Sequence, residues 1–231
     1  MKKIKVPNEL VYVLAIAMLS FAVAMMSCTN LGVSMIVAPA YILSCKVEAL
    51  TFGQSEYVLQ GIIFIIFCIL MKKVKLVYFS SFVTGLIYGA VLDFWRLVIP
   101  HFNPEITAPG SLPIWLRIIY FVLGMLMTAL SIAMFFRTYL YPQIYDFFVK
   151  GVSEKYSIDR TKFKIGFDMS MLALSVVMTL VLFRKFIGIG VGTLIMACVN
   201  GFVIGFFGKV LDKFFIFEPK AKKFSKYFDI T

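Results

Sequence analysis

The chain has 231 residues, of which 61% are hydrophobic and only 15% are charged, and its formal net charge is +11. Soluble domains carry about 25% charged residues, so this composition excludes a soluble globular protein and indicates membrane-spanning helices. The positive charge does not indicate a nucleic-acid partner, because membrane proteins collect Lys and Arg in their cytoplasmic loops. We expect one membrane domain over residues 1–231.

Six apolar runs without charged residues are long enough, with their flanks, to cross a bilayer. They predict an all-α, polytopic membrane helix bundle whose main partner is the lipid bilayer. The runs cover residues 10–28, 57–71, 76–92, 118–136, 169–183 and 186–208.

Two further apolar segments, residues 31–45 and 140–149, are short for a full crossing. Gly32 and Pro39 interrupt the first, and Pro142 interrupts the second. We expect two half-helices, and the sequence leaves re-entrant, interfacial and spanning placements open. Helix N-termini carry partial positive charge, so half-helices that enter from opposite faces would suit an anionic or polar ligand.

The positions of Lys and Arg predict which loops face the cytoplasm. With six crossings and a cytoplasmic N-terminus, 18 of the 23 basic residues lie on the inner side, as the positive-inside rule expects. We therefore predict a multi-pass protein of the bacterial cytoplasmic membrane with both termini in the cytoplasm. Residues 217–231 form a basic cytoplasmic tail that is attracted to anionic lipid.

The sequence contains a weak internal repeat. Met18–Met25 resembles Met127–Met134, and Gly89–Asp93 resembles Gly208–Asp212. Each half contains a long span, a short broken helix and two more spans, so the second half enters from the opposite side. This order predicts an inverted repeat of the kind found in secondary transporters, and chance similarity of small-residue patterns is the alternative. The two repeats cover residues 10–100 and 113–216.

Polar side chains within or beside the apolar segments are the candidate substrate-binding residues, because exposing such groups to lipid is costly. Asp146 ranks first, since two aromatic residues flank it, and an i,i+4 surface pair with Lys150 is its alternative. Asp93 and Arg96 stand one helical turn apart, and an ion pair between them would line a vestibule or anchor a helix end. The candidates are Asn30, Ser34, Gln60, Asp93, Arg96, Gln143, Asp146 and Asn200.

Several of these features also have structural explanations. Gln60 and Asn200 are expected to hydrogen-bond between helices unless they contact a ligand. Lys164 and Asp168 are expected to form a structural pair. Five glycines predict close contacts between helices, and they are Gly85, Gly89, Gly201, Gly205 and Gly208.

No motif for catalysis or metal binding is present in the sequence. His101 is the only histidine, and neither a His-Glu-x-x-His pair nor a Gly-x-Ser-x-Gly elbow occurs. The four cysteines lack the spacing of metal ligands. We therefore expect no enzymatic activity, no metal and no cofactor.

The order of parts resembles the YczE/YyaS/YitT group of uncharacterised bacterial integral membrane proteins. The resemblance rests on Asn30–Ser34 after the first span, Pro142–Asp146 after the fourth and Ser157–Arg160 before the fifth, and it covers most of the chain. In the group a Pro-Trp-Asp-like turn typically follows Gly-x-Ser, whereas here Met35–Val37 follow, so the first half lacks an acid. The resemblance implies a membrane protein and a suspected transporter.

Taken together, these observations favour a small secondary transporter or facilitator for a small polar or charged metabolite, with its site between the halves. Two alternatives stay open. One is the substrate-binding subunit of an energy-coupling-factor vitamin importer, which would purify with partner ATPases. The other is a non-transporting membrane partner of an enzyme complex. A homodimer also stays open.

The predicted topology can be tested by thiol labelling in intact cells. In a background without the four native cysteines, an impermeant reagent should label a Cys placed at Asn103 but not one placed at Ser225. The positive-inside rule puts the first position outside and the second inside. Labelling of the tail position alone would overturn this topology.

Overall fold

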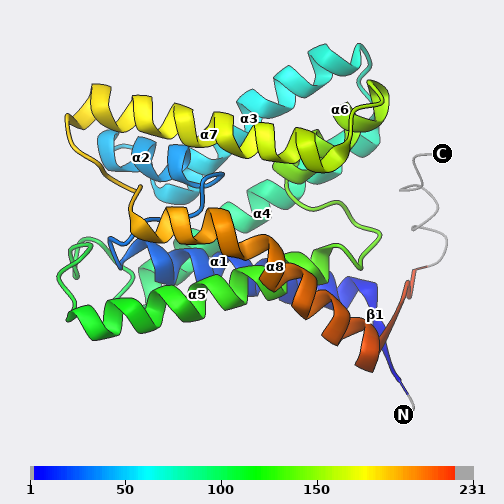
Figure 1. The fold of residues 1–231 in the computed structure, drawn as a ribbon, viewed down its shortest axis with the longest axis horizontal. Coiled ribbons are helices and arrows are strands. Elements are labelled where there is room, and N and C mark those ends of the chain that lie inside the picture. Colours follow the sequence, from blue (N-terminus) through cyan, green and yellow to red (C-terminus); the bar gives the residue numbers. More distant parts are fainter. Residues whose placement is uncertain (1–2, 222–231) are drawn as a thin grey trace.

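The computed structural model describes residues 3–221 (Figure 1). This part of the chain has six helices that are long and apolar enough to cross a membrane, which confirms the predicted polytopic helical bundle. They are α1 (Asn8–Ser27), α3 (Phe52–Met71), α4 (Leu76–Val98), α5 (Ile114–Phe135), α7 (Arg160–Phe183) and α8 (Val191–Phe214). Residues 222–231, the larger part of the predicted basic tail, lie outside the described residues.

Two short strands, which the sequence does not predict, mark one end of the bundle. β1 (Ile4–Pro7) pairs in parallel with β2 (Phe215–Glu218). We call this end, at the right of Figure 1, the strand end. The connections over residues 99–113 and 184–190 lie at the opposite end, at the left, which we call the loop end.

The carboxylate of Glu9 joins three segments at the strand end. It accepts hydrogen bonds from the backbone N–H groups of Lys220 and Ala221, at 3.1 and 2.9 Å, and from the hydroxyl of Tyr139 at 2.9 Å. Burial and the Glu9 carboxylate raise the pKa of Tyr139 to about 12, so this hydroxyl stays a donor at neutral pH. Helix α1, the segment that follows α5 and the residues after β2 are therefore held together.

The helices form two layers, which lie one above the other in Figure 1. In the first layer α1 packs on α4 and α5, and α5 packs on α8. The second layer contains α3, α7 and the two short helices, α2 (Ala38–Lys46) and α6 (Ile144–Lys155). α3 and α7 each contact both short helices, so the second layer forms a ring. α3 also packs on α4 and thereby joins this ring to the first layer.

Glycines allow α3 and α4 to approach closely. A Cβ atom on Gly53 would overlap the carbonyl oxygen of Gly89, and one on Gly85 would overlap the Gln60 amide, so the prediction for this helix pair is confirmed. The same prediction is wrong for Gly201 and Gly205, because a Cβ atom there would have no described neighbour within 4 Å. α8 presents that face outward.

Both short helices begin inside the bundle and end at its surface. Ala38 at the start of α2 is fully buried, and Lys46 at its end is exposed. Likewise Ile144 is fully buried at the start of α6, and Lys155 is exposed at its end. The N-terminal turns of the two predicted half-helices therefore point into the protein.

The first half-helix is shorter than the sequence predicts. Residues 31–34 are irregular and residues 35–37 form a turn instead of helix. Gly32 adopts a φ of +104°, which is not helical, and Pro39 lies in the first turn of α2, where the missing N–H has no helical partner to lose. The second half-helix begins four residues later than predicted, at Ile144.

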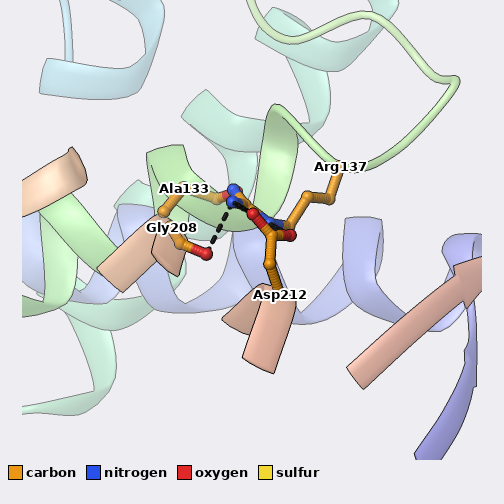
Figure 2. Close-up of polar contacts among 4 residues, drawn as sticks. All are labelled: Ala133, Arg137, Gly208 and Asp212. Atoms are coloured by element: carbon orange, nitrogen blue, oxygen red, sulfur yellow. Dashed lines mark hydrogen bonds and ion pairs between the residues drawn. The ribbon is translucent and has the colours of Figure 1, made fainter. Parts of the chain in front are cut away.

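At the strand end, Arg137 clamps the end of α5 to α8 (Figure 2). Its Nε and Nη2 atoms donate to the two carboxylate oxygens of Asp212 at 2.7 and 2.6 Å. Nη1 donates to the carbonyl of Ala133 at 2.7 Å, and Nη2 also donates to the carbonyl of Gly208 at 2.6 Å. A bidentate Arg pair of this kind fixes both distance and orientation.

The two sides of this clamp should contribute unequally to stability. Arg137→Gln should cost about 2 kcal/mol, because it removes charge-assisted hydrogen bonds and frees two backbone carbonyls. Asp212→Asn should cost less than about 1 kcal/mol, because the Asp212 side chain is 62% exposed and solvent screens exposed pairs. Thermal unfolding in detergent measures both. Equal losses, or a larger loss for Asp212, would contradict this assignment.

Candidate functional site

A fully buried carboxyl group lies where the two halves of the chain meet. Glu56 on α3 is 0% exposed. Its Oε2 atom accepts hydrogen bonds from Gln60 Nε2 at 3.0 Å and from the Tyr145 hydroxyl at 2.8 Å. Gln60 belongs to the same helix, whereas Tyr145 comes from α6 in the second half, so this carboxyl bridges the predicted repeats.

The local sequence places Glu56 one turn inside α3. Thr51 and Gln54 form a capping box, which fixes the helix start at Phe52. Asp93 of α4 reinforces that start, since it accepts from the Thr51 hydroxyl at 2.5 Å and from the Gly53 N–H at 2.8 Å. Glu56 therefore lies about 6 Å along the helix from its first residue.

Several buried oxygen atoms of Glu56 and its neighbours have no hydrogen-bond partner. Among the described residues they include Glu56 Oε1, Gln60 Oε1 and the hydroxyl of Tyr88, and Ser55, the residue before Glu56 on α3, adds its Oγ. Tyr88 on α4 is 1% exposed and lies within electrostatic range of Glu56. Because buried polar groups are normally paired, this concentration indicates a place for water, an ion or a solute. We call Glu56, Gln60, Tyr88 and Tyr145 the Glu56 centre.

No cation compensates Glu56 among residues 3–221, where every ion pair lies elsewhere. A lone ionised carboxylate in such surroundings costs several kcal/mol. The carboxyl is therefore stable there only as a neutral acid or beside a bound positive charge.

Helix α6 connects the Glu56 centre to the strand end. Tyr145, its second residue, contacts Glu56, whereas Lys155 Nζ and the Tyr156 hydroxyl donate to the carbonyl of Leu70 at 2.7 and 3.0 Å. Glu56 and Leu70 are about 21 Å apart along α3. Since α5 ends and α7 begins at the strand end, the segment over residues 136–159 enters the bundle and returns to the same end (Figure 1).

A cavity of about 270 Å³ opens beside α6 at the strand end. The rings of Phe67, Tyr78 and Phe147 close its inner side, with centroids 5.0 to 5.5 Å apart. All three are buried, and no member of the Glu56 centre lines the cavity. The complete lining is Phe67, Met71, Tyr78, Phe147, Gly151, Glu154 and Lys155.

Asp146, the first-ranked acid of the sequence analysis, belongs to an ion-pair network instead of the Glu56 centre. Lys164 of α7 lies 3.2 Å from Asp146 and 3.0 Å from Asp168, which confirms the predicted Lys164–Asp168 pair and adds a third member. The alternative pair with Lys150 does not form, because Lys150 lies over the ring of Tyr141. Asp146 therefore links α6 to α7.

Asp93 and Arg96 go to different partners and do not form the ion pair that their spacing suggests. Asp93 caps the start of α3, as described above. Arg96 lies over the ring of Phe52, with its guanidinium carbon 5.3 Å from the ring centroid. Both residues support the end of α3 that carries Glu56, and neither belongs to the Glu56 centre.

The remaining candidates are dispersed. Asn30 is exposed in a left-handed turn with a φ of 52°, and the carbonyl of Ser34 accepts from two N–H groups that open α2. Gln143 is the buried N-cap residue of α6, and its Nε2 has no described partner. Asn200 is half-buried on α8, and its Oδ1 has no hydrogen-bond partner among the described residues. Of the eight candidates, only Gln60 belongs to the Glu56 centre.

Comparison with known proteins identifies the family to which the chain belongs. The model of DUF6198, a family of unknown function, matches residues 6–209. No curated protein and no solved structure matches the chain significantly. The matched range contains both short helices and the whole Glu56 centre. The chain therefore belongs to the DUF6198 family.

Proposed function

We propose that this protein is a small secondary transporter or facilitator of a small polar or charged metabolite, with the Glu56 centre as its binding site. The observation that carries the proposal is the contact between the inner end of a re-entrant helix and a buried carboxyl that keeps one unpaired oxygen. Ionisable groups inside membrane proteins are costly, and they commonly mark solute or ion pathways.

The pattern of helix contacts supports the inverted repeat that such transporters use. Exchange of the two halves maps α1 to α5, α2 to α6, α3 to α7 and α4 to α8. The contact of α1 with α4 then corresponds to that of α5 with α8, and the contact of α3 with α6 corresponds to that of α7 with α2. The contact of α1 with α5 corresponds to itself, as a contact on a twofold axis does.

The two short helices support a site between the halves. Each begins inside the bundle, and the turn before α2 brings Ile36 against the apolar cluster that surrounds α6. In inverted-repeat transporters, interrupted helices of this kind surround a site near the middle of the membrane. With both termini in the cytoplasm, as the charges predict, the strand end is the cytoplasmic face.

The carboxyl group changes the expected charge of the ligand. Helix N-termini alone favour an anion, whereas Glu56 at the inner end of α6 favours a hydrogen-bond donor or a positive group. The proposed solute therefore carries an N–H or O–H donor, or a cationic group, toward Glu56 Oε1.

A thermal-shift screen of the purified protein against amino acids, vitamins, nucleobases and organic ions tests this proposal. At least one compound should raise the melting temperature of the wild type. Glu56→Gln should abolish that rise, because it removes the ionisable carboxyl group while it keeps the size of the side chain. Glu48→Gln is the matched control, since Glu48 is exposed near the loop end, and it should respond as the wild type does.

Two outcomes would contradict the proposal. A screen in which no compound stabilises the wild type would leave the Glu56 centre without a ligand. A compound that stabilises Glu56→Gln as strongly as the wild type would bind elsewhere. For any ligand found, uptake into proteoliposomes separates a transporter from a protein that only binds.

Asp146→Asn should weaken binding of the same compound several-fold with little loss of folded protein. Asp146 does not touch the Glu56 centre, but its link to Lys164 holds α6, which carries Tyr145. Isothermal calorimetry measures the effect, and circular dichroism serves as the folding control. Unchanged affinity would make Asp146 an ordinary structural residue.

A further inference from the structure

We infer that Glu56 carries an exchangeable proton, which serves as the coupling ion and reaches the carboxyl from the strand end. This inference rests on the proposed transport function for its biological role. The chemistry of the site and its test do not depend on a solute.

The neighbours of Glu56 fit a proton better than a metal cation. Gln60 offers an amide N–H and Tyr145 an O–H, and both donate to the same oxygen, Oε2. Their hydrogens, not their lone pairs, point toward this oxygen, and hard cations need about six oxygen ligands. The unpaired oxygens of Glu56, Gln60 and Tyr88 are fewer than that. Within the described residues no group of three or more acids, histidines or cysteines could hold a metal ion. A single proton on the carboxyl removes the uncompensated charge.

The titratable groups that face Glu56 do not supply the missing positive charge. Tyr145 faces it from α6 and Tyr88 from α4, and both are neutral hydroxyls that are almost fully buried. The third helix packed on α3 is α2, whose Tyr41 ring packs against Phe52 and whose Lys46 lies over the Phe183 ring. Asp93, also on α4, is held at the start of α3.

One face of α3 leads from the cavity to the carboxyl. Phe67, Ile63, Gln60 and Glu56 follow one another at intervals of three to four residues, and all four are buried. Phe67 lines the cavity at the strand end. Of the three rings that close the cavity, Phe147 lies on α6, so a small movement of α6 against α3 would open a path for water.

The proposed step is a simple proton exchange. With the path open, the Glu56 carboxylate takes a proton from a hydronium ion, which forms one O–H bond and leaves a water molecule. Release to water is the reverse reaction. No electron transfer or further reactant is involved.

Infrared spectroscopy of the purified protein tests this inference directly. A neutral carboxyl group gives a C=O stretching band that is separate from the bands of a carboxylate. The wild type and Glu48→Gln should show this band, it should disappear as the pH is raised, and it should shift in D₂O. Glu56→Gln should lack it. Phe147→Ala should speed the D₂O shift several-fold, because it opens the aromatic closure.

A second variant covers the case in which Glu56→Gln does not fold. Tyr145→Phe removes one hydrogen bond to the carboxyl and should move the band to higher frequency. If the band is absent from the wild type at every pH, or unaffected by either variant, the proton is not held by Glu56.

Other outcomes also decide the question. A band that persists at high pH and never shifts in D₂O shows a proton that does not exchange, and this overturns the inference. The band can instead be absent while sodium chloride, compared with choline chloride, stabilises the wild type but not Glu56→Gln. That result identifies a sodium site. A positive infrared result combined with a failed ligand screen would leave the proton site standing and remove the transport proposal.

Discussion

The hydrogen bond from Tyr145 to Glu56 is the contact on which the proposed mechanism depends. It joins the inner end of α6, in the second half of the chain, to α3 in the first half. A buried carboxyl needs such donors, because each unpaired polar atom in an apolar interior is costly. The same contact therefore stabilises the inner end of α6 and leaves one carboxyl oxygen available to the proposed ligand or proton.

The six spans could be predicted from the sequence because hydropathy and length are local properties. Glu56 could not be found in this way. The uncharged run begins at Tyr57, so a search for uncharged apolar runs leaves the preceding acid in the loop. The signal was present in Thr51 and Gln54, whose capping-box spacing starts the helix earlier and puts Glu56 and Gln60 on one face. The partners of Asp93 and Asp146 come from distant segments, and spacing along the chain does not reveal such contacts.

The two halves differ in how their last two spans pack. Glycines bring α3 and α4 together around the Glu56 centre, whereas α7 and α8 make no comparable contact in the described part of the chain. Gly208 of α8 instead faces Arg137, so α8 is attached through α5 (Figure 2). The first half thus supplies most of the proposed site, and the second half supplies the helix that reaches it.

Solute-driven proton movement in proteoliposomes shows whether Glu56 couples a proton to a solute. Proteoliposomes that contain a pH-sensitive dye would be exposed to mixtures of amino acids, vitamins, nucleobases and organic ions. We expect at least one mixture to change the internal pH with the wild type and with Glu48→Gln, but not with Glu56→Gln. A solute that accumulates equally with all three proteins, without any proton movement, would contradict this expectation.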